Sequence, residues 1–137
     1  MIILGVDLGK ARTGLAVCDK GEILASPLRV VEEHNRERLV EKVCAAAKET
    51  GAELLVVGLP RNMDGTEGES AQSARETAAL LEKAAALPVR LWDERGTTVT
   101  AHGYLNETNV RGKKRKAVVD AVAATVILQS YLDSGRK

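Results

Sequence analysis

The sequence predicts an α/β fold: a mixed five-stranded sheet with helices on both faces and the element order βββαβαβα. Two observations predict it. Short β-prone segments separated by polar turns fill the first third of the chain, and helix-like segments then alternate with strand-like ones. The chain has 137 residues, of which 28% are charged and 45% hydrophobic, as expected of a single globular domain covering residues 1–137.

The first third predicts an antiparallel meander. Residues 2–7 and 13–18 are β-prone and flank a polar turn, so they predict a hairpin. Residues 22–31 predict a third strand. Because Pro27 lacks an N–H group to donate to a neighbouring strand, that strand is expected at the edge of the sheet. A doubly wound sheet is the alternative topology, but it normally alternates helices and strands from the first strand onward.

The middle of the chain predicts a helix followed by a buried strand. Apolar residues recur at helical spacing between Asn35, a good N-cap, and Gly51, a good residue to follow a helix end. The continuous aliphatic run at 54–57 is typical of a strand buried on both faces. A turn-rich loop follows over residues 59–68.

The second half predicts two crossover connections. Ser70 is expected to cap an Ala-rich helix that ends before Pro88, and residues 89–93 predict a fifth strand. Strands joined by helical crossovers lie parallel, with right-handed connections. Thr97 or Thr98 is expected to cap a third helix to about residue 107. A basic loop and a final helix over residues 117–132 complete the prediction.

Composition gives no overall signal for binding to nucleic acid or to membranes, because the net charge is only +1. It also argues against a membrane-spanning protein, because no apolar stretch approaches the roughly 18 residues of a membrane span. Cys18 and Cys44 are far apart in sequence, which predicts two reduced core thiols rather than a metal site or a redox motif. Because no secretory signal opens the chain, we expect a cytoplasmic protein with no membrane partner.

Three acidic positions stand where a fold gains little from a charge. Asp7 ends an apolar strand between two glycines, where a carboxylate costs stability unless it is solvated, paired or metal-bound. Asp93 and Glu94 stand at the end of the fifth strand, and alternation places them on opposite faces unless the strand twists or ends there. A turn-capping role for Asp7, and a helix-capping role for one of the pair, are the structural alternatives.

Asp120 is the sharpest of these anomalies. It is the one charged residue in the otherwise uncharged segment 117–128, on a helix that is expected to be buried nearly all round. The structural alternative is that an acid in the first turn of this helix gains some stabilisation from the helix dipole. The expected topology lets the first strand, the fifth strand and the last helix bring three carboxylates together.

Such a cluster predicts a divalent-metal site. Clustered carboxylates repel one another and raise their own pKa values unless a cation neutralises them. An all-oxygen set of ligands favours Mg²⁺ or Mn²⁺. Two such ions would activate a water and stabilise the leaving oxygen in phosphodiester hydrolysis, so no side-chain nucleophile is required.

A basic run leads directly into the helix that carries Asp120. Five of the six positions 111–116 are positively charged, and cations at a helix N-terminus oppose the dipole, so capping alone does not explain them. Binding to phosphates is the functional interpretation, and a solvated charged loop is the alternative. The cations that we expect to line one nucleic-acid-binding groove are Lys10, Arg12, Arg61, Arg95, Lys113, Lys114, Arg115 and Lys116. With so few aromatic side chains, the groove is expected to recognise backbone and shape rather than stacked bases.

Four blocks of sequence carry a resemblance to a known family. They are GVDLGKARTGLAVCD at 5–19, VVGLPRNMDGTEG at 56–68, DERGTT at 93–98 and KKRKAVVDAVAATVILQSYL at 113–132. In this order they resemble the YqgF/RuvX family of bacterial ribonuclease H-like proteins. That family is described both as Holliday-junction resolvases and as nucleases that process the 5′ end of the small-subunit (16S) ribosomal RNA precursor.

The resemblance implies a ribonuclease H-like fold and a set of catalytic, metal-binding acids. Carried over by position, these are Asp7, Glu94 or Asp93, and Asp120. Glu94 is favoured over Asp93 because a longer side chain at the end of a strand can reach back to the metal.

Three hypotheses for function follow. The first is a Mg²⁺-dependent endonuclease that acts on structured RNA, with branched DNA as the alternative substrate; resolution of a DNA junction would need a homodimer with two active sites. The second is a nucleic-acid-binding module without catalysis. The third, a phosphotransferase, rests on a turn at residues 7–14 that is similar to the phosphate-binding hairpin of actin-like ATPases. Those proteins close around nucleotide with two such lobes, and this chain has room for one.

Overall fold

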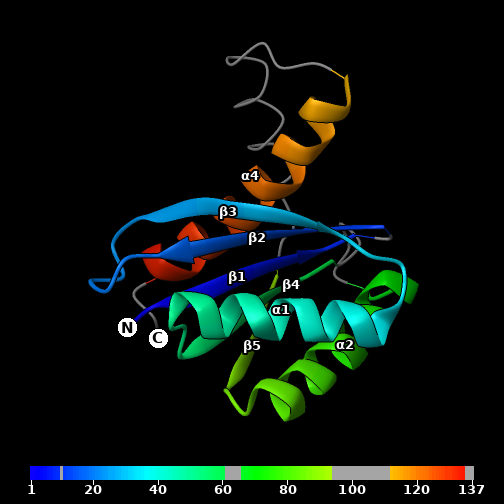
Figure 1. Ribbon diagram of the computed structural model, residues 1–137, viewed down its shortest axis with the longest axis horizontal. Coiled ribbons are helices and arrows are strands. Elements are labelled where there is room, and N and C mark those ends of the chain that lie inside the picture. The colour runs from blue at the N-terminus through cyan, green and yellow to red at the C-terminus, as the bar shows by residue number, and fades with distance from the viewer. Residues whose placement is uncertain (10, 61–65, 94–111, 135–137) are drawn as a thin grey trace.

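The computed structural model describes residues 1–9, 11–60, 66–93 and 112–134, the last range without the side chains of 112–120. Five strands form one mixed sheet, and helices cover both of its faces (Figure 1). The strands are β1 (Ile3–Leu8), β2 (Arg12–Cys18), β3 (Ala25–Glu32), β4 (Leu54–Leu59) and β5 (Val89–Asp93). The helices are α1 (Arg36–Thr50), α2 (Glu69–Ala85) and α4 (Gly112–Asp133).

The strand order is β3-β2-β1-β4-β5, which makes β1 the central strand. The first three strands pair antiparallel, whereas β4 pairs parallel to both β1 and β5. The predicted meander and the predicted parallel crossovers are therefore confirmed. Strand β3 lies at the edge, as Pro27 indicated, and its register with β2 shifts between Leu15 and Ala16, close to that proline.

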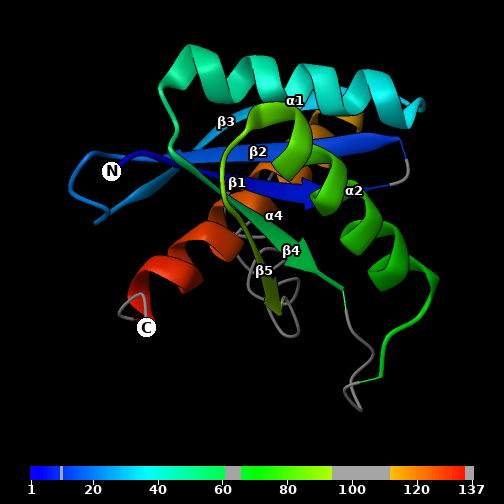
Figure 2. The same cartoon turned by 90° about the horizontal axis from the view of Figure 1, so that it is seen from below.

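The two faces of the sheet have separate aliphatic cores. Helices α1 and α2 cover one face, which we call the α1–α2 face, over Leu4, Val6 and Leu55 among others (Figure 2). Helix α4 covers the other, the α4 face, over Ile3 and Val56. All six residues of β4 are buried, which confirms the strand predicted from the run at 54–57.

Helix α1 begins and ends at the predicted residues. The side chain of Asn35 accepts a hydrogen bond from the backbone N–H of Arg38 at 3.0 Å, which satisfies one of the free donors of the first turn. Gly51 follows the helix with φ of 75°, a conformation that strongly favours glycine. Both cysteines are free. Cys18 is buried and Cys44 half-buried, and this burial raises the pKa of both thiols.

The predicted cap of α2 is wrong. The helix begins at Glu69, its N-cap is Gly68, and no side chain caps it, so Ser70 lies inside the first turn. The acidic side chain of Glu69 suits a first turn because it complements the positive end of the helix dipole. Glycine is also an acceptable N-cap, so the polar Ser70 was a misleading signal.

Helix α4 begins at Gly112, five residues before the predicted start at 117. Residues 113–116 are therefore helical rather than a basic loop. Lysine and arginine are good helix formers, and this preference outweighs the unfavourable position of their charges near the helix N-terminus. The helix expected to end near residue 107 lies outside the described residues. Within the part of the chain that the structure describes, no helix is long and apolar enough to cross a membrane.

Candidate active site

Asp7 lies near the carboxyl end of the central strand, on the α4 face. It is half-buried, and strand alternation puts it on the same face as Ile3 and Gly5. On β2 its pairing partner is Gly14, and the register that pairs Val6 with Val57 brings Gly58 of β4 alongside it. Neither neighbouring strand therefore places a side chain next to Asp7 on this face.

Gly5 allows α4 to lie directly on the central strand. A Cβ atom built on Gly5 would be 2.9 Å from the Cβ atom of Leu128 and 3.2 Å from the carbonyl oxygen of Ala124. The first of these distances is shorter than real contacts allow, so any side chain at this position would force the helix away. A glycine inside a strand often marks such a close approach of another backbone.

The direction of α4 brings the Asp120 position toward Asp7. Gln129 forms hydrogen bonds with the N–H of Ala25 (2.8 Å) and the carbonyl oxygen of Ile23 (3.0 Å), at the end of the sheet where β1 begins. Ala124 lies over Gly5, further along the strand, so α4 runs broadly opposite to β1 (Figure 1). Asp120 is one helical turn before Ala124, in the direction of the carboxyl end of β1.

Asp120 is the ninth residue of α4, in its third turn. Stabilisation by the helix dipole is confined to the first turn. The structural alternative for this acid, which assumed a helix beginning at 117, therefore no longer explains its position. Its side chain lies outside the described residues.

Strand β5 ends at Asp93, the first acid of the predicted pair. Asp93 pairs with Leu59, which packs against α2 together with Leu91, so Asp93 lies on the α1–α2 face. Trp92 packs on the opposite face, against α4. Asp93 and Asp7 are thus on different faces of the sheet. Glu94, the predicted ligand, lies outside the described residues.

Of the predicted basic groove, the structure describes the side chain of Arg12. Arg12 is the first residue of β2 and lies on the same face of the sheet as Gly14, two residues later in the sequence. Its Nε atom is 3.4 Å from a carboxylate oxygen of Glu32. Residues 113–116 occupy the start of α4, with their side chains outside the described part. Lys10, Arg61, Arg95 and Arg111 also lie outside it.

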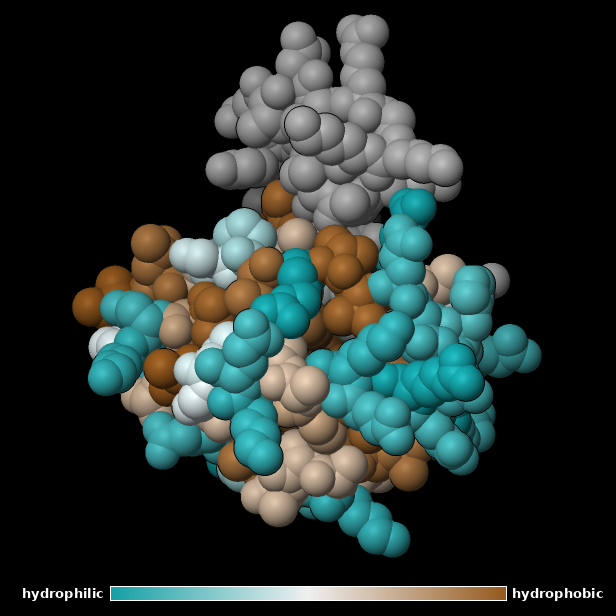
Figure 3. Space-filling model, viewed as in Figure 1, coloured by the Kyte–Doolittle hydropathy of each residue, from teal (hydrophilic) through white to brown (hydrophobic). Residues whose placement is uncertain are grey.

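On the α1–α2 face, several described cations are paired with carboxylates. Hydrophilic side chains gather over the N-terminal half of α1 and the neighbouring part of α2 (Figure 3). Arg36 there lies 2.9 Å from Glu76, and Arg75 binds Glu67 through two hydrogen bonds of 2.7 Å that raise the pKa of the guanidinium. Because carboxylates already neutralise these cations, this face is a poor surface for a phosphate backbone.

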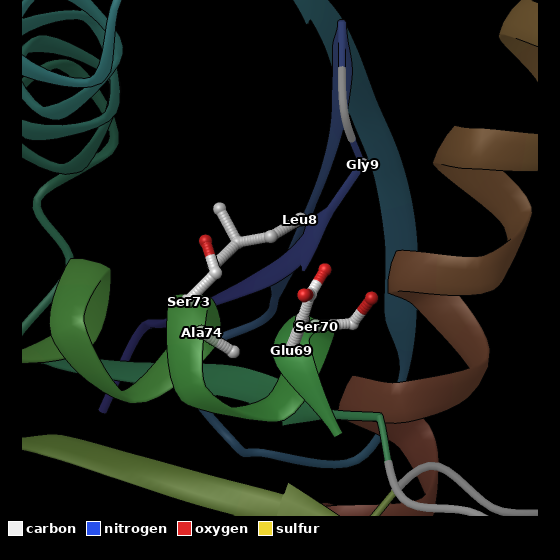
Figure 4. A pocket seen from close by; sticks show the side chains of 6 residues that line it. All are labelled: Leu8, Gly9, Glu69, Ser70, Ser73 and Ala74. Carbon is white, nitrogen blue, oxygen red and sulfur yellow. The ribbon is translucent and has the colours of Figure 1, made fainter.

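A cavity of about 340 Å³ lies between the end of β1 and the first turns of α2. Figure 4 shows that Glu69 and Ser70 point into it from α2, beneath Leu8 and Gly9. Leu8 packs on the α1–α2 face, so this cavity is across the sheet from Asp7. A carboxylate in its wall repels phosphate, and the cavity is therefore not a candidate for the nucleic-acid backbone.

The predicted metal site remains a prediction. Among the side chains that the structure describes, no group of three or more His, Cys, Asp or Glu could hold a metal ion. Glu94 and the side chain of Asp120 are outside that set, so the described part of the proposed cluster consists of Asp7 alone.

Sequence reasoning noted Gly5 and Gly9 beside Asp7 but missed Gly14 and Gly58 on the neighbouring strands. Gly5, Gly14 and Gly58 all lie inside strands, where glycine costs stability because it packs no side chain. Three such residues near one acid are a signal that the sequence does contain. At Gly5 the signal corresponds to the close approach of α4 to the central strand.

A comparison with family models decides the assignment. The model of RuvX, described as Holliday junction resolvase, matches residues 1–134. The chain belongs to the RuvX family. The resemblance drawn from four blocks of sequence is thereby confirmed over nearly the whole chain.

Full-length relatives agree with the RuvX assignment. A protein of Clostridium botulinum is 44% identical over 133 residues, which are 97% of each chain. One from Anaeromyxobacter is 45% identical over 133 residues, again 97% of each. Both carry the provisional name of pre-16S rRNA nuclease.

Solved structures show that the RuvX chain shares its fold with RuvC. Thermus thermophilus RuvC, solved in complex with a Holliday junction substrate, superposes with a TM-score of 0.63 at 16% identity. The superposition covers 98% of this chain and 96% of RuvC. The predicted ribonuclease H-like fold is confirmed.

Proposed function

We propose that this protein is a divalent-metal-dependent nuclease that hydrolyses phosphodiester bonds in structured nucleic acid. Its proposed substrate is the 5′ end of the small-subunit (16S) ribosomal RNA precursor, in the cytoplasm. The observation that carries the proposal is the placement of Asp7 on the central strand, beside Gly14, under a helix that carries a second acid one turn before Ala124. The names of the full-length relatives support the choice of RNA.

The proposed metal ligands and catalytic acids are Asp7, Glu94 and Asp120. Glu94 is preferred to Asp93 because Asp93 lies on the α1–α2 face, away from Asp7. Trp92, two positions before Glu94 in the sequence, packs on the α4 face, which is the face of Asp7. Three carboxylates form an all-oxygen donor set, which fits Mg²⁺ or Mn²⁺ and does not fit softer metals.

The residues divide the chemistry between them. A divalent cation held by Asp7, Glu94 and Asp120 would supply activation of a water and stabilisation of the leaving oxygen. Asp7 belongs to the central strand, and the backbone pairing of β1 with both of its neighbours fixes its position. Its pairing partner on β2 is Gly14, so that strand places no side chain next to it on the α4 face. The cations at 113–116 are proposed to bind phosphates next to the acids.

Cleavage of a precursor fragment tests the proposal. The purified protein should cut a 16S precursor RNA with Mg²⁺ or Mn²⁺ and not with excess chelator. Asp7→Asn should abolish cutting while RNA binding remains. Glu41→Gln, the same change of carboxylate to amide on the exposed surface of α1, is the matched control and should cut normally. Undiminished cleavage by Asp7→Asn would overturn the carboxylate mechanism, and binding without any cleavage would favour a non-catalytic binding module.

A second candidate is resolution of Holliday junctions in DNA. The description of the matching family model favours it. A resolvase must cut two strands symmetrically, which calls for a homodimer with two active sites. Cleavage of a synthetic four-way junction by a dimer, measured together with sedimentation, would support this candidate. A monomer that cuts only RNA would exclude it.

A further inference from the structure

Trp92 links the end of β5 to helix α4. Its indole Nε1–H donates a hydrogen bond to the hydroxyl oxygen of Ser130 at 3.1 Å. Its ring also meets Tyr131 edge to face, with centroids 5.4 Å apart and planes at 87°. A directed hydrogen bond and a ring contact together restrain both the tilt and the in-plane rotation of the indole.

Trp92 lies in the same row of the sheet as Asp7. Trp92 pairs with Gly58 of β4, and Gly58 lies alongside Asp7, so the three residues form one row across the sheet. Gly58, between Asp7 and Trp92 in this row, has no side chain. The residue after Trp92 is Asp93, where the acidic pair begins.

The three elements that carry the proposed acids are held together in three different ways. Backbone ladders through β4 connect β1 to β5. The close contact at Gly5 fixes α4 on β1. Between β5 and α4, Trp92 bonds to Ser130, meets the ring of Tyr131 and packs against the apolar cluster of the α4 face. If this third connection loosens, the end of β5 can shift relative to α4 although the sheet stays intact.

We propose that Trp92 is a positioning residue that, through Ser130 and Tyr131, holds the acid-bearing end of β5 in register with α4. The inference rests on the proposed function, because the acids at the end of β5 matter only where they act together with Asp7 and Asp120. A residue that only fills the core would add stability. A positioning residue changes metal affinity and turnover beyond its effect on stability.

Conservative variants separate the two roles. Trp92→Phe keeps a ring next to Tyr131 and removes the N–H donor, Ser130→Ala removes the acceptor, and Ser130→Thr restores a hydroxyl. We expect kcat for RNA cleavage to fall about tenfold in the first two variants, in the range seen when residues that orient metal ligands are removed. KM should stay within about twofold, and Ser130→Thr should recover most of the rate.

Metal binding can be read without cleavage. Trp92 is the one tryptophan of the chain, so intrinsic fluorescence reports on this position alone. Titration with Mn²⁺ should change the emission of the wild-type protein. In Ser130→Ala the midpoint of that titration should move to about tenfold higher Mn²⁺, and in Ser130→Thr it should return toward the wild-type value.

The control is Val43→Ala, which removes buried volume from the core on the α1–α2 face. It should lower stability while the Mn²⁺ midpoint and kcat stay unchanged at temperatures where the variant is folded. If Ser130→Ala keeps the wild-type Mn²⁺ midpoint and kcat, and Trp92→Phe keeps the wild-type kcat, Trp92 is a core residue only and the inference is overturned.

The two proposals fail in distinguishable ways. A wild-type protein that cuts RNA with metal, beside a Ser130→Ala variant with normal kcat and normal Mn²⁺ midpoint, refutes positioning and leaves the nuclease intact. A Mn²⁺ midpoint that Ser130→Ala shifts, in a protein that cuts no nucleic acid, supports positioning and refutes the nuclease. Absence of Mn²⁺ binding by the wild type refutes both.

Discussion

Replacing Gly5 with alanine should separate the central strand from the helix that carries Asp120. The added Cβ atom would be 2.9 Å from the Cβ atom of Leu128, whereas two carbon atoms pack best at about 3.5–4.0 Å. The helix must therefore retreat by roughly 0.6–1.1 Å. The other close neighbour of the new atom is the carbonyl oxygen of Ala124, which is backbone and cannot rotate away.

Two magnitudes follow from that displacement. Overpacking of a tight core contact costs about 1–3 kcal/mol, so the free energy of unfolding should fall by that amount in urea titrations. A misplacement of about 1 Å between reacting groups can cost on the order of 100-fold in rate, so kcat for RNA cleavage should fall far more than stability alone implies. Both are measured on one preparation, with kcat taken at a temperature where the variant remains folded.

Gly21→Ala is the matched control, because the nearest atoms to a Cβ atom there are 3.4 Å away, an ordinary contact. Its stability should change by less than about 0.5 kcal/mol and its kcat should not change. If Gly5→Ala has the stability and turnover of Gly21→Ala, the close approach of α4 does not organise the site and the reasoning fails.

Three further predictions concern the caps and the charges. Asn35→Ala removes the side-chain cap of α1 and should lower the free energy of unfolding by about 1 kcal/mol in urea titrations. Two backbone N–H groups lower the pKa of Asp19, so its stabilising contribution is complete above about pH 4 and is lost as pH falls further; Asp19→Asn should weaken the acid dependence of the melting temperature between about pH 5 and 2. Replacing Lys113 and Lys114 with Gln should weaken RNA binding and reduce the slope of log K against log salt by about 1 for each phosphate that the variant no longer neutralises, as measured by fluorescence anisotropy.

Much of the fold was predictable because its signals are local. The aliphatic run in β4 reports burial on both faces, and Asn35 and Gly51 bound α1 through backbone geometry that lies within a few residues of each. Pro27 identifies an edge strand because it lacks a donor. Local signals failed where two of them competed: at the start of α4, helix propensity prevailed over the helix dipole, and at α2 a glycine cap preceded the more conspicuous Ser70.

The candidate site was predictable only in part. A lone carboxylate at the end of an apolar strand identifies Asp7, and the topology that makes β1 central follows from the element order. The contacts that organise the site join distant parts of the chain. Gly5 meets Leu128, and Trp92 meets Ser130, 38 residues away, so no pattern within either segment reveals them.

The central claim is that Asp7 and Asp120 share a divalent cation between β1 and α4. Diffraction from crystals soaked in Mn²⁺, recorded where Mn²⁺ scatters anomalously, tests it most directly. The account predicts an anomalous peak within coordination distance of carboxylate oxygens of both residues. The contrary result is a map at saturating Mn²⁺ with no peak between them and with each carboxylate bonded to its own neighbouring amides or cations.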